Sequence, residues 1–547
     1  MTNGGRVAAD TFGKGDAGAI KVSAMGDITV DGEDSQGFKS GLTSIVNQGA
    51  KGDGGDITIS VNDLNLNNGG RVSTISFSQG DSGNIFIQAD ENISLSNGNI
   101  VSLINPGGMG TAGNIDIETN SLSLKEGGQI QSGLFRTDEG LPGGQGLGGN
   151  ITITSKDYID ISGLDSDSFS SSIITITEQG ASGDAGDVIL NTGKLLLSDS
   201  GNINSATRNS SNAGDIIINA SSFEATSGGQ IRATTARSSG NAGNITLNID
   251  GSIDISGSDP TFNQRLEQFG EDFVSDAGAE SGLFVNATAN STGQAGSLLL
   301  SAEQLNLSQQ GTISASTQVG NGGNVSLMIS KDISLKNNST ISARAFGEAN
   351  GGNLDIDARF IVAFPNQIDG NGSDIIANAG EGNGGNIAIS AESLFGMDER
   401  DATLNNQTND IDASSEFGLD GSISIFTPDI NPVQRAAELP NNIVEPQQTT
   451  TQACETNREA QAKNGLNIRG KGGVPADPGL PFDSQNISIN GKYSNPISTI
   501  PQPLETSQGK IQPARGIKVT EDGGIVLTAY RTNNAGERLA EGSLNCS

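Results

Sequence analysis

The sequence contains no histidine and no tryptophan, and only 3 tyrosines and 2 cysteines among its 547 residues. Without an imidazole, the Ser-His-Asp and Cys-His arrangements and all histidine-ligated zinc sites are excluded, whereas carboxylate chemistry remains open to an enzyme. Hydrophobic residues amount to 33%, which is too few to fill a thick two-layer core. No apolar run approaches the length of about 18 residues that a membrane-spanning helix requires.

Positive charge is also scarce. Lysine and arginine number 30 against 63 acidic residues, which gives a formal net charge of −33. A chain of this charge is repelled by phosphate backbones, and this argues against a nucleic-acid partner. Residues 1–10 have neither a basic segment nor an apolar segment, so no secretory signal is present there.

Glycine, by contrast, is abundant, with 77 residues, and the composition changes near residue 428. Residues 428–547 contain 11 of the 15 prolines and both cysteines, and their 12 acidic and 11 basic residues nearly cancel. The acidity and most of the glycine therefore belong to residues 1–427. We predict a repeat domain over 1–427 and a separate C-terminal domain over 428–547.

The first part repeats the phrase Gly-x-[Ala/Gly/Ser]-Gly-[Asp/Asn/Ser]-[Ile/Val/Leu]-x-[Ile/Leu/Val], with small departures, thirteen times. The shortest spacings between copies are 27 to 30 residues, and longer spacings indicate insertions in that unit. The copies begin at Gly15, Gly52, Gly80, Gly110, Gly146, Gly183, Ser211, Gly240, Gly293, Gly320, Ala349, Gly382 and Gly418.

Two further phrases follow in each unit. An alternating triplet such as residues 93–95 or 122–124 comes about eight residues after the start of the glycine-led strand, and a Gly/Asn turn then leads into another alternating segment such as 127–131. One unit is therefore predicted to contain three short strands separated by turns. Three such strands cannot bury enough apolar area alone, whereas stacked units form continuous aliphatic columns.

The pattern thus predicts an all-β fold, a parallel β-helix of about 13 coils that is roughly 60 Å long at the strand spacing of a sheet. Glycine is expected to supply corners with positive φ, and asparagine to stack in hydrogen-bonded ladders at the turns.

One segment has helical periodicity. In a lateral insertion over about 257–282, Asp259 is predicted as the helix cap and Pro260 as its first turn. The apolar face of this helix would consist of Phe262, Leu266, Phe269 and Phe273. We interpret it as packing sideways on the solenoid, with docking of a partner as the alternative. Insertions near 135–149, 163–172 and 398–412 are predicted to be surface loops.

The glycine phrase, alternating with Gly-Gly-Gln-Ile-x-[Ser/Ala], resembles the filamentous haemagglutinin-type exoproteins of bacterial two-partner secretion, in their cyanobacterial form. The segment Ala453-Cys454-Glu455, followed by Gly-Lys-Gly-Gly-Val-Pro at 470–475, is similar to the C-terminal region of that family. The resemblance implies a right-handed β-helix, export through an outer-membrane transporter partner, and an adhesive role outside the cell or at its surface. Its cell-surface or glycan ligands are not identified by the sequence.

The start of the chain departs from the family pattern, because the family's cleavable signal and N-terminal secretion domain are missing. Residues 4–8, Gly-Gly-Arg-Val-Ala, already match the third strand phrase of a unit. We therefore predict that Met1 lies inside the solenoid and that the chain is a fragment.

The C-terminal part is predicted to be a small α+β domain. Helices are expected over 431–439 and 453–463, and a hairpin over 517–528. Cys454 and Cys546 can form a disulfide that closes most of this domain into one loop, worth on the order of 4 kcal/mol in the chain-entropy model. The alternative is two free thiols.

Two acidic pairs, Asp157 with Asp160 and Asp165 with Asp167, are candidates for calcium binding or for acid and base roles. Such pairs arise easily among 63 acidic residues, and a sugar-cleaving site also needs cationic and aromatic residues that are few here. We therefore expect no catalytic residue, no metal site and no cofactor. Divalent cations are expected to bind only diffusely, because the repeats lack the nine-residue period of calcium-binding rolls.

These observations favour a non-enzymatic adhesin-like or structural exoprotein. Two alternatives remain open: a secreted carbohydrate-active β-helix enzyme, either a lyase or a hydrolase, and a carrier of a contact-dependent effector in the C-terminal part. Turnover of acidic polysaccharides would distinguish the first alternative from the adhesin.

Overall fold

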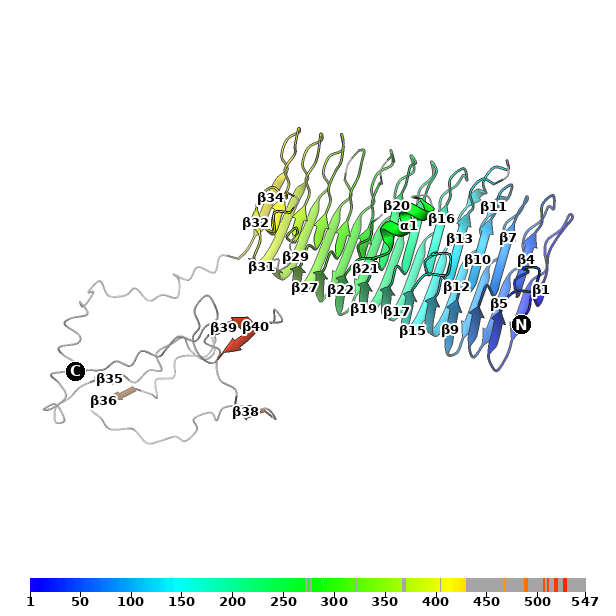
Figure 1. Cartoon of the computed structure of the whole chain (residues 1–547), viewed down its shortest axis with the longest axis horizontal. Coiled ribbons are helices and arrows are strands. Elements are labelled where there is room, and N and C mark those ends of the chain that lie inside the picture. Colours follow the sequence, from blue (N-terminus) through cyan, green and yellow to red (C-terminus); the bar gives the residue numbers. More distant parts are fainter. Residues whose placement is uncertain are drawn as a thin grey trace. The chain divides into compact units, whose positions relative to one another are not determined.

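The computed structural model describes residues 1–428 except 139, 271–273, 275–277, 289, 321, 366–369 and 404, together with the backbone of short strands beyond residue 465. The chain divides into two units, Met1–Ile430 and Asn431–Ser547, and the predicted change of composition at 428 lies close to this division. The first unit consists of strands stacked side by side in rows (Figure 1).

The first row of the stack is made by the strands that follow the glycine phrases. Each pairs in parallel with its equivalent in the next unit of sequence, as in the register of Ile57 with Ile85 and of Ile85 with Ile115. The row contains β2 (Ile20–Ser23), β5 (Ile57–Val61), β8 (Ile85–Ala89), β12 (Ile115–Lys125), β15 (Ile151–Ser162), β17 (Val188–Ser198), β19 (Ile216–Thr226), β21 (Ile245–Ile249), β24 (Leu298–Ala302), β27 (Val325–Lys336), β29 (Leu354–Ala363), β31 (Asn386–Phe395) and β34 (Ser422–Phe426).

The second row is made by the alternating triplets. In some units the triplet is a separate strand, and in others, such as β12 and β15, one long strand passes through both rows with a bulge between them. The separate strands are β3 (Ile28–Asp31), β6 (Leu64–Asn67), β9 (Asn92–Ser96), β22 (Ser252–Ser256) and β25 (Gln304–Ser308).

The third row is a sheet of parallel strands that follow the Gly/Asn turns. At its end the order of the strands departs from their order in the sequence. The last strand is β32 (Asp398–Glu399), which pairs with the outer edge of β33 (Asp410–Asp412). The other members are β1 (Arg6–Ala8), β4 (Gly41–Val46), β7 (Arg71–Ser76), β10 (Asn99–Ile104), β13 (Gln129–Leu134), β16 (Ser172–Thr177), β18 (Asn202–Thr207), β20 (Gln230–Thr235), β23 (Gly282–Phe284), β26 (Thr312–Ser314), β28 (Thr340–Ser342), β30 (Asp374–Ile376) and β33 (Asp410–Asp412).

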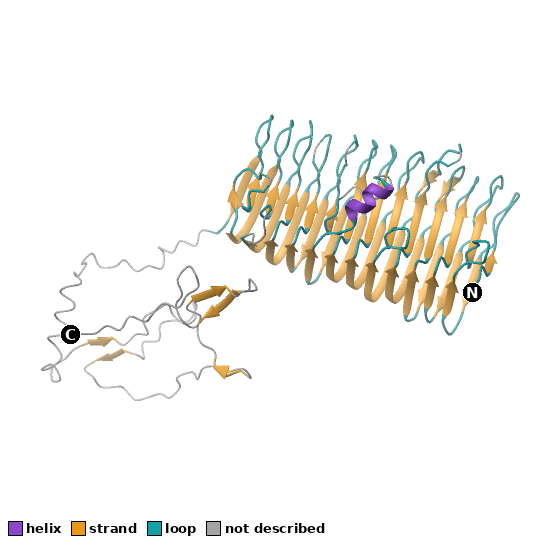
Figure 2. Ribbon diagram, viewed as in Figure 1, coloured by secondary structure: helices purple, strands orange, loops and turns teal. Residues whose placement is uncertain are grey.

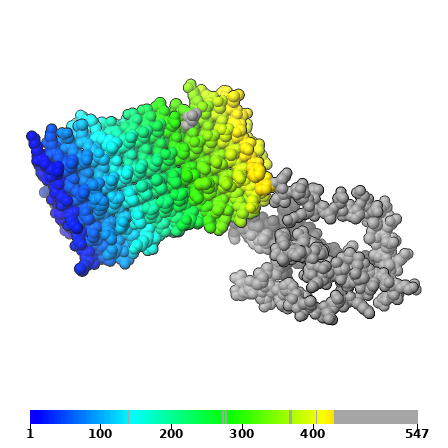
Figure 3. Space-filling model, turned by 180° about the vertical axis from the view of Figure 1, so that it is seen from behind, coloured from blue at the N-terminus to red at the C-terminus, as the bar shows by residue number. Residues whose placement is uncertain are grey.

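The core runs the length of this unit. Alternate residues of all three rows point inward, and their aliphatic side chains form one continuous buried cluster from Ile20 to Ala413. Each strand completes its burial against the equivalent strand of its neighbours, which is the arrangement that single units could not achieve. The predicted parallel β-helix is confirmed (Figure 2), and consecutive parts of the sequence form consecutive bands of its surface (Figure 3).

The fourth residue of the repeated phrase forms a column of glycines. A Cβ atom on Gly214 would lie 2.0 Å from the carbonyl oxygen of Gly186, and one on Gly186 would lie 2.1 Å from that of Gly149. Neither residue has positive φ, so close approach of the backbones is what requires glycine here. The first glycine of the phrase, as at Gly80 with φ 145°, is the expected corner with positive φ.

Asparagine and aspartate at the fifth phrase position form the predicted ladder. The amide nitrogen of Asn114 donates to Asn84 Oδ1 at 2.8 Å, and that of Asn150 donates to Asn114 Oδ1 at 2.9 Å. Asn84 Nδ2 in turn donates to Asp56 Oδ1 at 3.1 Å. The ladder therefore combines side-chain pairs with bonds from the backbone to the side chain of the preceding coil, which satisfies turn amides that the strands leave unpaired.

The lateral insertion contains α1 (Phe262–Phe269), shown as the helix lying against the strands in Figure 2. The predicted cap needs correction, because Thr261 occupies the N-cap position. Asp259 instead stabilises the N-cap residue itself, because its Oδ1 accepts hydrogen bonds of 2.7 Å from both Thr261 N and Thr261 Oγ1. Phe262, Leu266 and Phe269 are half-buried rather than fully buried, and Phe273 lies outside the described residues.

Two predicted loops contain strands. In the 135–149 insertion, β14 (Gln145–Leu147) pairs in parallel with β11 (Met109–Thr111). The prediction of a surface loop over 398–412 is wrong at the end of that segment, because β33 is buried and places Ile411 in the core. The aspartates of this segment suggested a solvent-exposed loop, but in the structure their carboxylates accept hydrogen bonds within the sheet.

In the second unit the predicted hairpin is present. The strands β39 (Gly516–Val519) and β40 (Ile525–Thr528) are antiparallel, with Val519 opposite Ile525. The other pairs are β35 (Leu466–Ile468) with β36 (Ile487–Ile489) and β37 (Glu505–Thr506) with β38 (Gly509–Lys510). The predicted helices over 431–439 and 453–463, and both cysteines, lie outside the described residues.

Candidate functional site

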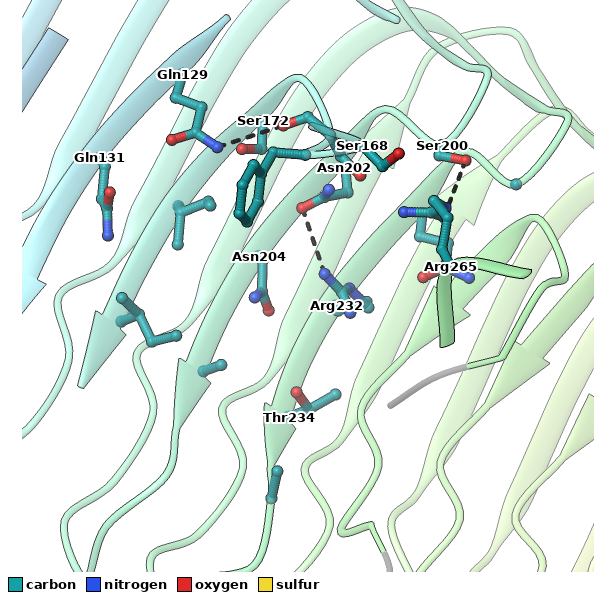
Figure 4. A pocket seen from close by; sticks show the side chains of 18 of the residues that line it. Gln129, Gln131, Ser168, Ser172, Ser200, Asn202, Asn204, Arg232, Thr234 and Arg265 are labelled. Atoms are coloured by element: carbon teal, nitrogen blue, oxygen red, sulfur yellow. Dashed lines mark hydrogen bonds between the residues drawn. The ribbon is translucent and has the colours of Figure 1, made fainter. Parts of the chain in front are cut away.

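A groove of about 350 Å³ lies on the outward face of the third row, over β13, β16, β18 and β20 (Figure 4). One wall is the lateral insertion with α1, and the turn over 163–171 adjoins it. We call this feature the amide groove, because amide side chains dominate its floor. The floor residues that define it are Gln129, Gln131, Ser172, Asn202, Asn204, Gln230 and Arg232.

The register of the third row places these floor residues side by side. Asn202 lies next to Gln230, and Asn204 lies next to Arg232, on neighbouring strands. Arg232 Nη2 donates to Asn202 Oδ1 at a long 3.4 Å. Gln230 Nε2 donates to the carbonyl oxygens of Gly278 at 2.9 Å and Glu280 at 2.8 Å, which ties the floor to the lateral insertion.

Asn204 differs from its neighbours. Its side chain points into the groove and is only 9% exposed, yet its Oδ1 has no hydrogen-bond partner. Ser172 Oγ, in the same floor, also has none, and Ser172 is 1% exposed. Buried polar atoms without partners are rare in native proteins because each costs its desolvation free energy. The floor therefore contains two buried oxygens, Asn204 Oδ1 and Ser172 Oγ, whose loss of hydration no hydrogen bond offsets.

The α1 wall is held in place by ionic and aromatic contacts. Arg265 Nη2 donates to Asp259 Oδ2 and, at 3.4 Å, to Ser200 Oγ on the solenoid. Burial raises the pKa of Asp259, but hydrogen bonds from Thr261 and Arg265 outweigh burial and leave the pKa below its ordinary value. Asp259 is therefore ionised at neutral pH and retains its ion pair with Arg265.

The turn over 163–171 supports this wall and contains one of the predicted acidic pairs. Asp165 Oδ1 accepts hydrogen bonds from the amides of Asp167 at 2.9 Å and Phe169 at 2.8 Å. The ring of Phe169 lies 6.4 Å from that of Phe269 in α1. Asp165 thus orders the turn that presents Phe169 to the groove, and this is a positioning role rather than a catalytic one.

The opposite rim of the amide groove carries further cations and an aromatic ring. The guanidinium of Arg136 lies 6.0 Å from the ring of Phe135, and Arg208 pairs with Glu178 at 3.6 Å. With Arg232 and Arg265, the described residues of the lining include four arginines and two carboxylates, Glu178 and Asp259.

The other predicted pair, Asp157 with Asp160, does not form a joint site. Asp157 is exposed in a bulge of β15 between Ser155 and Tyr158. Asp160 lies on the outward face beyond the bulge and forms an ion pair of 3.4 Å with Lys125. The structure therefore assigns Asp160 a surface ion pair and leaves Asp157 in solvent.

A buried acidic cluster lies near the end of the third row, over β30 and β33, and the sequence did not single it out. Asp410 accepts hydrogen bonds from Arg400 Nε at 2.6 Å and from Thr408 Oγ1 at 2.9 Å. Asp412 Oδ2 accepts from Asn378 Nδ2 at 2.7 Å. Burial raises the pKa of Asp374 to about 6, although a hydrogen bond from the amide of Asp410 opposes this effect.

Within the described part of the chain, histidine, cysteine, aspartate and glutamate nowhere form a group of three or more that could hold a metal ion. The described residues also include no helix that is long and apolar enough to cross a membrane. Cys454 and Cys546 are not among the described residues.

A signal for the amide groove was present in the sequence. Three third-row strands begin with two polar residues that flank one isoleucine: 129–131 (Gln-Ile-Gln), 202–204 (Asn-Ile-Asn) and 230–232 (Gln-Ile-Arg). Alternation places each isoleucine in the core and both polar residues on the outside. The sequence did not show that the insertion after β22 returns over these residues.

Comparisons with family models, with curated proteins and with solved structures gave no match for this chain.

Proposed function

We propose that this chain is a non-enzymatic, adhesin-like exoprotein that is exported by two-partner secretion and displayed outside the cell. The observation that carries the proposal is the uninterrupted stack of in-register coils, whose buried core extends from Ile20 to Ala413. Its repeat phrases resemble those of filamentous haemagglutinin-type exoproteins, for which an outer-membrane transporter is the expected partner.

The architecture suits export of an unfolded chain. Each coil contacts only its neighbours, so folding can begin at one coil and proceed coil by coil. A chain that emerges progressively from a transporter can therefore bury each new strand on the coil already formed, and no contact has to wait for a distant part of the sequence. A stack of this kind also presents outward-facing side chains at regular spacing, which suits repeated weak contacts with a surface.

A carbohydrate-active enzyme is the second candidate, because Asp374 and Asp410 are neighbouring carboxylates and the pKa of Asp374 is raised to about 6. However, Asp374 is 6% exposed and Asp410 is fully buried, and both accept hydrogen bonds within the protein. Their positions favour a structural role over contact with a polymeric substrate.

The test compares cells that carry the gene with and without the transporter gene. We expect protease-accessible protein on intact cells, and adherence that falls several-fold when either gene is removed. Retention inside the cell, or unchanged adherence without the chain, would contradict the proposal. Turnover of acidic polysaccharides by the purified chain, abolished by Asp374→Asn, would favour the enzyme instead.

A further inference from the structure

A group of three cations lies at one end of the third row, apart from the amide groove. The strands β1, β4 and β7 are neighbours there (Figure 1), and their register places Arg6 and Arg71 on either side of Gly41. Lys39 lies two residues before Gly41, at the end of the turn over 33–39. We call Arg6, Lys39 and Arg71 the cationic cluster. The description of residues 1–138, which contain it, has no gap.

The two arginines of the cluster lean toward the strand between them. A Cβ atom on Gly41 would lie 2.8 Å from Arg71 Cγ, so the stem of the Arg71 side chain lies over this glycine. Arg6 Nε donates to the carbonyl oxygen of Lys39 at 3.1 Å, and the Arg6 guanidinium lies 5.2 Å from the centroid of the Phe38 ring. Both arginine side chains therefore reach the short segment from Phe38 to Gly41.

Lys39 brings a third positive charge to the same place. Its side chain extends toward the turn before β7, where a Cβ atom on Gly69 would lie 3.4 Å from Lys39 Nζ. Arg6 is exposed, whereas Lys39 and Arg71 are half-buried. All three side chains thus keep surface that an ion in solution can contact, and burial reduces the competition from water at two of them.

Among the residues that the structure describes, the cationic cluster has no paired counter-ion. None of its three side chains forms an ion pair there, and Arg71 Nε is buried without a hydrogen-bond partner. Burial and the charge of Arg6 lower the pKa of Arg71, while the carboxylate of Asp10 raises it. Asp10 itself accepts a hydrogen bond from the amide of Ile45 at 3.1 Å. Like charges held together in this way cost free energy, which a bound anion would recover.

The acidic residues of the adjoining turn are not paired with the cluster either. Asp34 Oδ1 accepts hydrogen bonds from the amides of Gln36 at 2.8 Å and Phe38 at 2.9 Å, so this carboxylate fixes the shape of the turn. Glu33 is exposed and forms no ion pair within the described part of the chain. The three cations therefore remain available to an anion from solution.

Two guanidiniums that approach from different sides select for an anion with oxygens on more than one side. A carboxylate has two oxygens in one plane, and a single guanidinium occupies both of them through parallel hydrogen bonds. A phosphate group has at least three acceptor oxygens in a tetrahedral arrangement and a charge of about −1.5 to −2 at neutral pH. It can therefore bind both arginines at once, and its charge suits three cations better than that of a carboxylate or of a singly charged sulfate ester.

We propose that the cationic cluster binds a phosphate group, either free or as a monoester, over Gly41 and between Arg6 and Arg71, with Lys39 adding charge. The site goes beyond the proposed function and does not depend on it, because binding is a property of the purified chain. The net charge of −33 repels extended polyanions, but salt screens this repulsion over about 8 Å, so a small anion responds mainly to the nearest charges.

The test is calorimetric titration of the purified full chain with glucose 6-phosphate, glucose 6-sulfate and glucose. We expect saturable binding of glucose 6-phosphate, binding of the sulfate that is weaker by about tenfold or more, and no measurable binding of glucose. Inorganic phosphate is titrated next to them, and the tighter of the two phosphates shows whether the site takes the free ion or the ester. Equal affinity for phosphate and sulfate esters, or no saturable binding of either phosphate, would overturn the proposal.

One variant locates the site at Arg71. Arg71→Met keeps a stem over Gly41 without the charge, and we expect phosphate affinity to fall by about tenfold or more. The melting temperature should stay the same or rise, because the variant removes a repulsion and no ion pair. Arg359→Met is the matched control, since Arg359 is an exposed arginine on β29 that pairs with Asp332 at 3.3 Å. Wild-type affinity in Arg71→Met, or an equal loss in Arg359→Met, would overturn the assignment.

A second variant should change the affinity in the opposite direction. Asp10→Asn removes a carboxylate that competes for Arg71 and keeps an oxygen for the amide of Ile45. Phosphate should then bind several-fold more tightly than it binds the wild type. Unchanged or weaker binding by Asp10→Asn would contradict the placement of the phosphate beside Arg71.

Discussion

The carboxylate of Asp374 accepts a hydrogen bond of 2.9 Å from the backbone nitrogen of Asp410, on the neighbouring strand of the third row. Burial raises the pKa of Asp374 to about 6 in spite of this bond. The nearby carboxylates of Asp410 and Asp412 raise the pKa further, while Arg344 lowers it. The fold therefore favours the protonated form of Asp374.

The first prediction is that Asp374 makes stability depend on pH between about 4 and 6. Below pH 3.8 the side chain is protonated in both the folded and the unfolded states. Between pH 3.8 and 6 the unfolded state releases its proton first, so the free energy of unfolding falls as pH rises, by on the order of 3 kcal/mol from this group. Above that range both states are ionised and the loss is complete.

Chemical denaturation of Asp374→Asn at several pH values checks this prediction. The variant keeps the oxygen that accepts from Asp410, so it should be more stable than the wild type at pH 7 and should lack this part of the pH dependence. Asp355→Asn, at an exposed position of β29, is the control and should follow the wild-type profile. An unchanged profile in Asp374→Asn would refute the effect.

The second prediction concerns the glycine column. Gly214→Ala places a Cβ atom 2.0 Å from the carbonyl oxygen of Gly186, so adjacent coils have to separate. We expect a loss of about 2–3 kcal/mol, as for other cases of overpacking. Gly13→Ala is the control, since a Cβ there meets nothing within 4 Å, and its effect should stay within about 0.5 kcal/mol. Denaturant midpoints of the two variants decide the matter, and equal midpoints would contradict the close-approach explanation.

The third prediction concerns the core. Phe223 on β19 is fully buried, between Leu195 and Ile253 of the neighbouring coils. Phe223→Ala should lower the free energy of unfolding by about 3–5 kcal/mol because it leaves a cavity, whereas Phe223→Leu should cost much less. Phe86→Ala, at an outward position of β8 that is 40% exposed, should have a small effect. Similar losses at both phenylalanines would argue against the inward and outward assignment of the strands.

The fourth prediction concerns charge along the stack. Asp53 accepts a hydrogen bond from the amide of Asp81, while its own amide donates to Asp16, which puts three exposed carboxylates on successive coils. Asp53→Asn keeps the acceptor oxygen and removes one of the repelling charges, so it should raise the melting temperature at low salt. The gain should shrink near 1 M salt, where the screening length is about 3 Å. Melting curves at the two salt concentrations test this, and a gain that does not depend on salt would exclude a charge effect.

The candidate site shows where sequence reasoning stops. Alternation alone shows that the polar residues on either side of Ile203 and Ile231 face outward. Successive side chains of a strand point to opposite faces, and both isoleucines are buried. The burial of these polar residues is not visible, because it depends on an insertion of variable length that folds back over two coils. The burial of Asp410 is not visible in the sequence either. The residues around it suggest a loop, but Asp410 lies in the buried strand β33, where Arg400 donates a hydrogen bond to its carboxylate.

The sequence by itself determined the parallel β-helix, because a phrase that recurs with aliphatic residues at alternate positions can bury them only by stacking like on like. It also determined the hairpin of β39 and β40, which depends on local turn chemistry. Only the tertiary structure decided where α1 lies, that Asp165 and Asp259 support a wall, and that Asn204 is enclosed without a partner. The turns around Asp165 and Asp259 are local, but their placement depends on contacts between residues that are far apart in the sequence, such as Phe169 with Phe269 and Arg265 with Ser200, and no local pattern encodes such contacts.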